Sequence, residues 1–263
     1  MRLWERPFAG QFHCAAGGGC GARSRNHPCH EAQLPRHACV PKAPLWERAR
    51  FGGIVAILLL LSAASHAAVP FTVHIDTTKA PECEAFASKS KTLVEEWYPK
   101  INEILFGKNH PLPSPDVSLI FEPMKGVAST SKNVIRISTE WVTKKAPNDY
   151  GMVIHELTHI VQDYRGKGEG WLTEGIADYI RDRHFEPGVR HHRIDPDKGS
   201  YKQAYGVAAT FLIWLEEHKN KDLVRKLNIA SHDGVYRREL FAELCGADLD
   251  TLWKEFAETQ RPR

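Results

Sequence analysis

The pattern of hydrophobic and polar positions changes its period several times after residue 70. Apolar and polar residues alternate over residues 71–75 and again over 117–121, which predicts two half-buried β-strands. Between these segments, apolar residues recur at spacings of three and four over residues 86–105, the period of an amphipathic helix. Pro81 is expected to open this helix and Gly107 to end it. The pattern therefore predicts two strands joined by one long helix that packs on their sheet.

A β-hairpin and a series of helices are predicted for the rest of the chain. Residues 126–130 and 133–138 are expected to pair around a turn at Ser131 and Lys132. Helices are predicted over residues 152–164, 171–184, from a capping box at Ser200 and Gln203 onward, 223–229, 236–244 and 249–257. This order predicts one α+β domain, with a small mixed sheet, a long packing helix and a helical C-terminal lobe.

The predicted helix over residues 152–164 carries the sequence His-Glu-Leu-Thr-His. His155 and His159 are four residues apart, so both imidazoles project from one face of the helix and can reach one cation, with Glu156 beside it. A chance match on a surface helix is the alternative. The apolar stripe of this helix would bury the motif, and buried ionisable side chains need the compensation that a metal ion provides. A zinc ion held by two histidines needs one more protein ligand and keeps a position for water.

The third metal ligand is predicted to come from the next helix. Glu174 and Asp178 are again four residues apart, within the sequence Trp-Leu-Thr-Glu-Gly-Ile-Ala-Asp-Tyr. One carboxylate can bind the metal while the other accepts a hydrogen bond from the second nitrogen of a ligand imidazole. We predict Glu174 as a ligand of one zinc ion and Asp178 as the carboxylate that holds a ligand histidine.

These two segments resemble the gluzincin metallopeptidases, in which a second helix supplies a glutamate to the HExxH site. The stretch over residues 126–215 is most similar to the basic secretory protein family of peptidases. The resemblance is carried by Gly-Val-Ala-Ser-Thr-Ser at 126–131, by HELTHIVQ, by EGIADYIR, and by Tyr-Gly-Val-Ala-Ala-Thr-Phe-Leu at 205–212.

The resemblance implies a zincin-like fold and a role for each matching residue. His155, His159 and Glu174 match the zinc ligands, and Glu156 matches the catalytic base. Asp178 matches the carboxylate that supports a ligand histidine in thermolysin-like enzymes. The metzincin pattern is excluded because it requires a histidine six positions after the second histidine of the motif, where this chain has an arginine.

The same resemblance points to groups that would contact a substrate. In zincins the strand above the metal receives the substrate backbone, so residues 127–130 are a candidate peptide-binding edge, with a plain sheet edge as the alternative. Tyr205 is a candidate donor to the oxyanion that forms on the attacked carbonyl, and core packing is its alternative role. The polar segment 186–199 is predicted to be a solvated loop, whose His191 and His192 are the other candidate donors.

The N-terminal region differs from the rest of the chain. We predict an unstructured extension over residues 1–50, from a start site assigned too early, a signal peptide over 51–67, and one domain over 68–263. The protein is therefore expected to be secreted or periplasmic, without stable membrane association after cleavage, and an uncleaved anchor is the alternative. Four cysteines of this region lack the paired spacing of a zinc knuckle. Whether the other two, Cys83 and Cys245, form a disulfide is left open.

The net charge of +3 comes from this N-terminal region. Residues 1–67 hold 8 of the 35 basic residues and 3 of the 32 acidic residues, so the remainder has a net charge of −2. No basic surplus is left to neutralise phosphate groups, and we predict no nucleic-acid partner.

The sequence as a whole predicts a secreted zinc metallopeptidase that hydrolyses peptide bonds with metal-activated water. An endopeptidase is favoured because the chain lacks the GxMEN stretch with which related aminopeptidases bind the amino terminus of a substrate. An exported zinc protein that binds a partner without turnover and a hydrolase of cell-wall amides are the alternatives. The sequence does not determine the natural substrate, the cleavage specificity or the oligomeric state.

Overall fold

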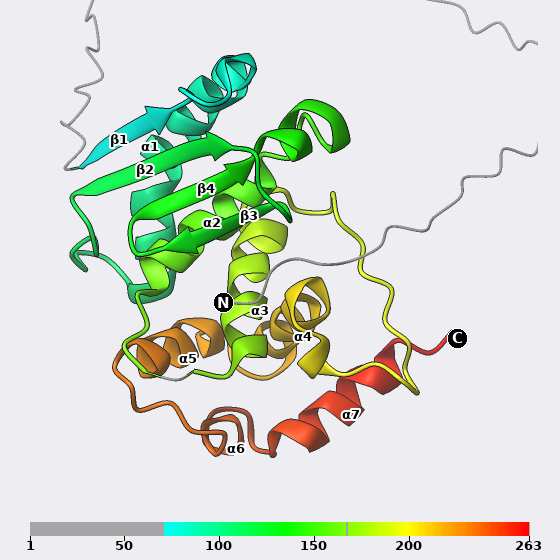
Figure 1. The fold of residues 1–263 in the computed structure, drawn as a ribbon. Coiled ribbons are helices and arrows are strands. Elements are labelled where there is room, and N and C mark those ends of the chain that lie inside the picture. Colours follow the sequence, from blue (N-terminus) through cyan, green and yellow to red (C-terminus); the bar gives the residue numbers. More distant parts are fainter. Residues whose placement is uncertain (1–70, 167, 263) are drawn as a thin grey trace, which may run out of the picture. The chain divides into compact units, whose positions relative to one another are not determined.

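The computed structural model describes residues 71–166 and 168–262, which form a four-stranded sheet followed along the chain by helices (Figure 1). Residues 1–67 lie outside the described residues. The predictions of an N-terminal extension and a signal peptide, and the prediction about the four cysteines, fall in this region. Among the described helices, none is both long enough and apolar enough to cross a membrane.

The four strands of the described chain form a mixed sheet in the order β1-β2-β4-β3. They are β1 (Thr72–Asp76), β2 (Asp116–Glu122), β3 (Ala128–Ser131) and β4 (Val134–Ser138). Strands β1, β2 and β4 run parallel, while β3 pairs antiparallel with β4 and forms one edge of the sheet. Val117, Leu119 and Phe121 are fully buried on one face of β2, as the alternating pattern predicts. Both predicted strands and the predicted hairpin are confirmed.

Helix α1 (Glu84–Phe106) makes the crossover between the parallel strands β1 and β2. A 3₁₀ turn at Pro81–Cys83 precedes the helix, and Gly107 follows it with a φ of 93°, a conformation that suits a residue without a Cβ. Its buried side, which includes Val94 and Ile101, packs against the sheet. The predicted long packing helix is therefore confirmed at both ends.

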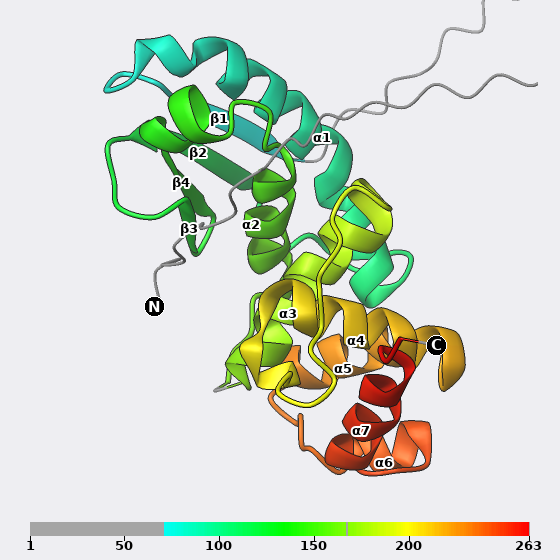
Figure 2. The same cartoon turned by 90° about the vertical axis from the view of Figure 1, so that its right-hand side faces the viewer.

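The described chain then continues mainly as helices. They are α2 (Gly151–Gln162), α3 (Gly170–Tyr179), α4 (Tyr205–His218), α5 (Leu223–His232), α6 (Leu240–Cys245) and α7 (Leu249–Thr259). Shorter elements are π-helical turns at Trp141–Lys145 and Ile180–Phe185 and a 3₁₀ turn at Tyr201–Gln203. Figure 2 shows α2 between the sheet and the C-terminal helices. This arrangement confirms the predicted α+β class with a helical C-terminal lobe.

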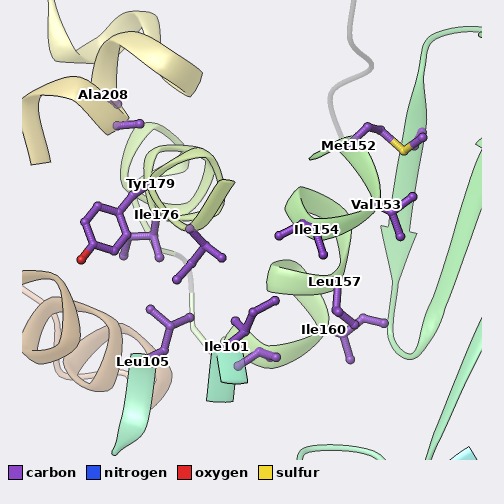
Figure 3. Close-up of a cluster of buried hydrophobic side chains, with 14 of the residues drawn as sticks. Ile101, Leu105, Met152, Val153, Ile154, Leu157, Ile160, Ile176, Tyr179 and Ala208 are labelled. Carbon is purple, nitrogen blue, oxygen red and sulfur yellow. The ribbon is translucent and has the colours of Figure 1, made fainter. Parts of the chain in front are cut away.

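Helix α2 is almost entirely buried because apolar residues cover opposite sides of it. Met152 and Val153 face the sheet, whereas Ile154 faces α3 (Figure 3). These three residues are at most 4% exposed, and so are Leu157 and Ile160 one and two turns further on. Any polar side chain of α2 that points between these layers therefore lies in a largely apolar surrounding and needs a partner there.

Helices α3 and α4 approach each other closely at Gly175. A Cβ built on Gly175 would lie 2.7 Å from the Cβ of Ala208, a separation too short for two carbon atoms that are not bonded. Glycine at this position therefore lets the two helices pack in contact. This packing brings the start of α4 next to the helix that carries Glu174.

Several predicted helix boundaries are wrong. Helix α2 ends at Gln162 because Asp163 adopts a left-handed conformation with φ 34° and ψ 46°. The capping box of Ser200 and Gln203 is present, but it caps only a 3₁₀ turn. The backbone leaves the helical conformation at Ala204, which has a φ of 58°, and α4 begins at the next residue.

Two further predictions concern the helical lobe and the cysteines. The helix predicted from residue 236 begins only at Leu240, since residues 236–237 are irregular and residues 238–239 form a turn. Cys83 is a buried free thiol and Cys245 is a partly buried one. The open question of a disulfide between them is answered, because the two sulfur atoms are not bonded.

Candidate metal centre

Three side chains from α2 and α3 bring their metal-binding atoms together. His155 Nε2 lies 3.2 Å from His159 Nε2 and 3.2 Å from Glu174 Oε2, and His159 Nε2 lies 3.4 Å from the same Glu174 oxygen. A tetrahedral zinc ion with bonds of about 2.0–2.1 Å separates its ligand atoms by about 3.4 Å. The two nitrogens and the oxygen therefore fit three of the four positions around an ion of this size. All three predicted ligand residues belong to this group.

Asp178 fixes the orientation of the His155 ring. Its Oδ1 lies 2.7 Å from His155 Nδ1, and both side chains are buried. This contact leaves Nε2 as the ring nitrogen that faces Glu174. Burial disfavours the imidazolium, but Asp178, Glu174 and Glu156 together outweigh burial and raise the pKa of His155 to about 10 in the metal-free protein. A metal ion must therefore displace a proton from His155 when it binds at neutral pH.

Gln162 fixes the orientation of the His159 ring, as Asp178 does for His155. Gln162 Oε1 lies 2.8 Å from His159 Nδ1, and Gln162 Nε2 donates to the Thr173 carbonyl oxygen at 2.9 Å. One side chain thus orients a candidate ligand and joins α2 to α3 directly before Glu174. Burial opposes the ionisation of Glu174, but hydrogen bonds from His155 and His159 prevail and lower the pKa of Glu174 to about 2. Glu174 is therefore a carboxylate, the form that binds metals.

The polar segment after α3 supplies a positive charge behind Asp178. Arg190 Nη2 donates to Asp178 Oδ2 at 3.0 Å, and Arg190 Nη1 lies 3.0 Å from Asp182 Oδ1. His192 Nε2 lies 2.8 Å from the other oxygen of Asp182. The prediction of a solvated loop is therefore wrong at Arg190 and His192, because each pairs with a largely buried aspartate. It holds at His191, which is exposed.

Glu156 lies on α2 next to the candidate ligands and is only 3% exposed. Thr130 Oγ1, on the edge strand β3, donates to Glu156 Oε2 at 2.6 Å and lies 3.0 Å from the Glu156 carbonyl oxygen. A small cavity adjoins Glu156 and His155. Its other lining residues are Val127, Trp141, Asp149, Met152 and Arg181. The carboxylate thus has a fixed partner on one side and open space nearby.

Tyr205 lies against His155 at the start of α4. The two ring centroids are 6.2 Å apart and the ring planes differ by 25°. His192 packs instead on Gly206, where an added Cβ would lie 1.9 Å from the imidazole ring. Of the three candidate oxyanion donors, Tyr205 is the one that contacts a candidate metal ligand, while His191 is exposed. Its role in the reaction stays a prediction.

Three residues contact the site in ways that were not predicted from the sequence. They are Gln162, Arg190 and Thr130, of which Thr130 lies within the predicted peptide-binding edge but was not expected to contact Glu156. Gln162 follows His159 by three residues on the same helix face, so helical spacing contained the signal that would have identified it. Thr130 and Arg190 reach the site through contacts between segments that are distant in the chain, and no local pattern marks them.

Comparison with known proteins gives one match that covers most of the chain. A family model described as "Peptidase of plants and bacteria" matches residues 68–256. The search of curated proteins gave no match.

Comparison with solved structures gives partial matches at low sequence identity. A mutant of a two-domain M1 zinc metallopeptidase bound to L-tryptophan has 12% sequence identity and a TM-score of 0.41, over 63% of this chain and 44% of that one. An M1 zinc metallopeptidase from Deinococcus radiodurans has 13% identity and a TM-score of 0.40, over 64% of this chain and 42% of that one. The chain spans less than half the length of either structure.

Proposed function

Since the chain belongs to the basic secretory protein family, the peptidases of plants and bacteria, we propose that it is a zinc-dependent endopeptidase that acts outside the cytoplasm. The family model covers the segment from β1 to residue 256, within α7, and includes both helices of the candidate metal centre. Peptides or proteins are therefore the substrate class. The placement outside the cytoplasm rests on the signal peptide predicted over residues 51–67.

The juxtaposition of three ligand atoms with a buried glutamate carries this proposal. His155, His159 and Glu174 offer one atom each at mutual distances of 3.2, 3.2 and 3.4 Å. A structural zinc site usually has four protein ligands and needs no further carboxylate. Here three ligands are grouped, and Glu156 stands directly beside His155 in the chain with only 3% of its surface exposed. This combination favours catalysis over a purely structural or binding role.

Each residue of the site has a distinct role in the proposed hydrolysis. A zinc ion held by His155, His159 and Glu174 would supply Lewis acidity, which lowers the pKa of water to about 7 and polarises a carbonyl group. Glu156 takes a proton from the attacking water and later gives it to the leaving nitrogen. Tyr205 donates its hydroxyl proton in a hydrogen bond to the oxyanion that develops on the substrate.

The edge strand β3 offers a way to hold an extended substrate. Among the described strands it pairs only with β4, so its other side forms an edge of the sheet at which a peptide strand could pair. Because β3 also contacts α2, a peptide on this edge would lie close to the candidate metal centre. The absence of a GxMEN stretch from the sequence supports cleavage within a peptide rather than at its amino terminus.

Substitution of Glu156 by glutamine tests the proposal directly. The purified wild type should hold one equivalent of zinc by elemental analysis and cleave casein or a peptide mixture in a chelator-sensitive manner. Glu156→Gln should keep the zinc and the fold but lose turnover by about 10²–10⁴-fold, the usual contribution of a general base. Glu103→Gln, at an exposed position of α1, is the matched control and should be fully active.

The outcomes separate the proposal from its alternatives. A Glu156→Gln protein as active as the wild type would refute the assignment of the base. One equivalent of zinc without cleavage of any peptide would favour a binding protein. Cleavage of a cell-wall amide in place of peptides would move the activity to another substrate class with the same chemistry.

A further inference from the structure

The edge strand β3 and the candidate base are joined by one side chain. Thr130 lies on β3 and pairs through its backbone with Ile135 of β4. Its Oγ1 lies 2.6 Å from Glu156 Oε2 and 3.0 Å from the Glu156 carbonyl oxygen. The hydroxyl has one proton to donate, and the shorter contact leads to the charged acceptor, which is the stronger partner. The hydroxyl therefore holds one particular oxygen of the Glu156 carboxylate.

This contact distinguishes the two oxygens of the carboxylate. A glutamate whose end is not held turns broadly about its last torsion, so that either oxygen can face a given point. Thr130 takes one acceptor position of Oε2, so the held carboxylate can present Oε1 to a water molecule. A general base works only when the accepting oxygen lies within hydrogen-bond reach of the proton that it removes. A fixed carboxylate meets this condition without a search among rotamers.

We propose that Thr130 is a positioning residue for the Glu156 base: its hydroxyl holds Oε2 and thereby presents Oε1 to the reacting water. This inference rests on the proposed peptidase function, because it gives Thr130 a purpose only if Glu156 acts as the base. Thr130 belongs to the strand whose free edge is available to a substrate. One short strand then both receives the peptide and orients the group that activates the water.

Two substitutions separate positioning from simple packing. Thr130→Val keeps the β-branched shape and the strand preference of threonine but removes the hydroxyl. Thr130→Ser keeps the hydroxyl and removes a methyl group. Thr143→Val is the matched control, since it removes a threonine hydroxyl that donates to the Thr139 carbonyl oxygen. Each full-length protein is assayed for zinc content, melting temperature, kcat and KM with one peptide substrate.

Positioning predicts a specific pattern across these variants. Thr130→Val should lower kcat by about 10–100-fold, part of the contribution of a general base, while KM stays within about twofold and one zinc equivalent is kept. Thr130→Ser should recover most of the lost kcat, and Thr143→Val should behave as the wild type. In a Glu156→Gln background, Thr130→Val should cause no further loss, because the hydroxyl acts through Glu156.

Other results would overturn the inference. A folded, zinc-loaded Thr130→Val protein with a kcat within twofold of the wild type would show that the hydroxyl has no part in turnover. A Thr130→Ser protein as impaired as Thr130→Val would show that packing is what matters. Thr130→Ala provides a second hydroxyl-free variant if Thr130→Val does not fold. An active Glu156→Gln protein would defeat the proposed function itself, whereas an inactive one beside a fully active Thr130→Val would defeat this inference alone.

Discussion

The replacement of Asp178 by asparagine measures what the carboxylate behind His155 contributes to metal binding. Asp178 accepts hydrogen bonds through both oxygens, from His155 Nδ1 at 2.7 Å and from Arg190 Nη2 at 3.0 Å. Asparagine has nearly the same shape but only one acceptor oxygen, so its NH₂ group must face one of these two donors. The variant therefore loses the negative charge and one of the two hydrogen bonds.

The size of the effect follows from two opposing terms. Loss of such a supporting partner lowers metal affinity by about 10–100-fold, or about 1.4–2.7 kcal/mol. Asp178 is fully buried, so water cannot replace its contact, and the upper value is expected when no proton competes. The same carboxylate is the main one of the groups that raise the pKa of His155 to about 10, so it also makes the proton on His155 harder for zinc to displace. With a His155 pKa of about 10, competition by the proton weakens zinc binding to the wild type by about 300-fold at pH 7.5 and by about 10-fold at pH 9. Removal of the charge weakens both zinc binding and this competition, so we expect little net loss of affinity at pH 7.5 and a loss of about 10-fold at pH 9.

Competition with a chromophoric zinc chelator at pH 7.5 and pH 9 measures this loss, and circular dichroism checks the fold. Asp182→Asn is the matched control, because Asp182 pairs with Arg190 and His192 on the same helical segment. It should bind zinc within about threefold of the wild type, below the range for a direct supporting partner. An Asp178→Asn protein that is folded and binds zinc as tightly as the wild type at both pH values would refute the reasoning.

Three further predictions follow from the site and its supports. Zinc binding at pH 7.5 should release about one proton from His155, measured by calorimetry in buffers of different ionisation enthalpy, whereas an ordinary histidine of pKa about 6.5 would release about 0.1. Tyr205→Phe should lower kcat by about 100-fold with little change in KM if its hydroxyl binds the oxyanion, and an unchanged kcat would assign Tyr205 to packing. Gly175→Ala should lower the free energy of unfolding by about 1–3 kcal/mol in a denaturant titration, since its Cβ would lie 2.7 Å from that of Ala208, and unchanged stability would contradict this contact.

The sequence predicts those parts of the fold and site that depend on spacing within one element. His155 and His159 share a helix face because they are four residues apart, and their grouping with Glu174 needed only two neighbouring helices. The strands can be predicted because burial of one face imposes alternation of apolar and polar residues, as at Leu119 and Phe121 of β2. Local periodicity depends only on the order of residues, so these features can be predicted without knowledge of tertiary contacts.

The remaining features depend on contacts that local patterns do not encode. Arg190 stands in a polar segment whose composition is typical of a loop, and its partner is known only once α3 has buried Asp178. The link from Thr130 to Glu156 joins residues that are 26 apart in the chain. The interruption between the 3₁₀ turn and α4 places Ala204 at a positive φ. Alanine rarely adopts this conformation, so tertiary packing must impose it.

The short separation of the candidate ligands along the chain has a consequence for how the ion and the protein depend on each other. His155 and Glu174 are only 19 residues apart, so the length-dependent entropy of closing this loop is about 2.6 kcal/mol, whereas a loop of about 100 residues would add about 1.5 kcal/mol more. Two packed helices supply that closure on their own, and hydrogen bonds already orient both imidazoles. The ion is thus not needed to gather its ligands, and stripping it with a chelator should leave a folded apoprotein that regains zinc without refolding.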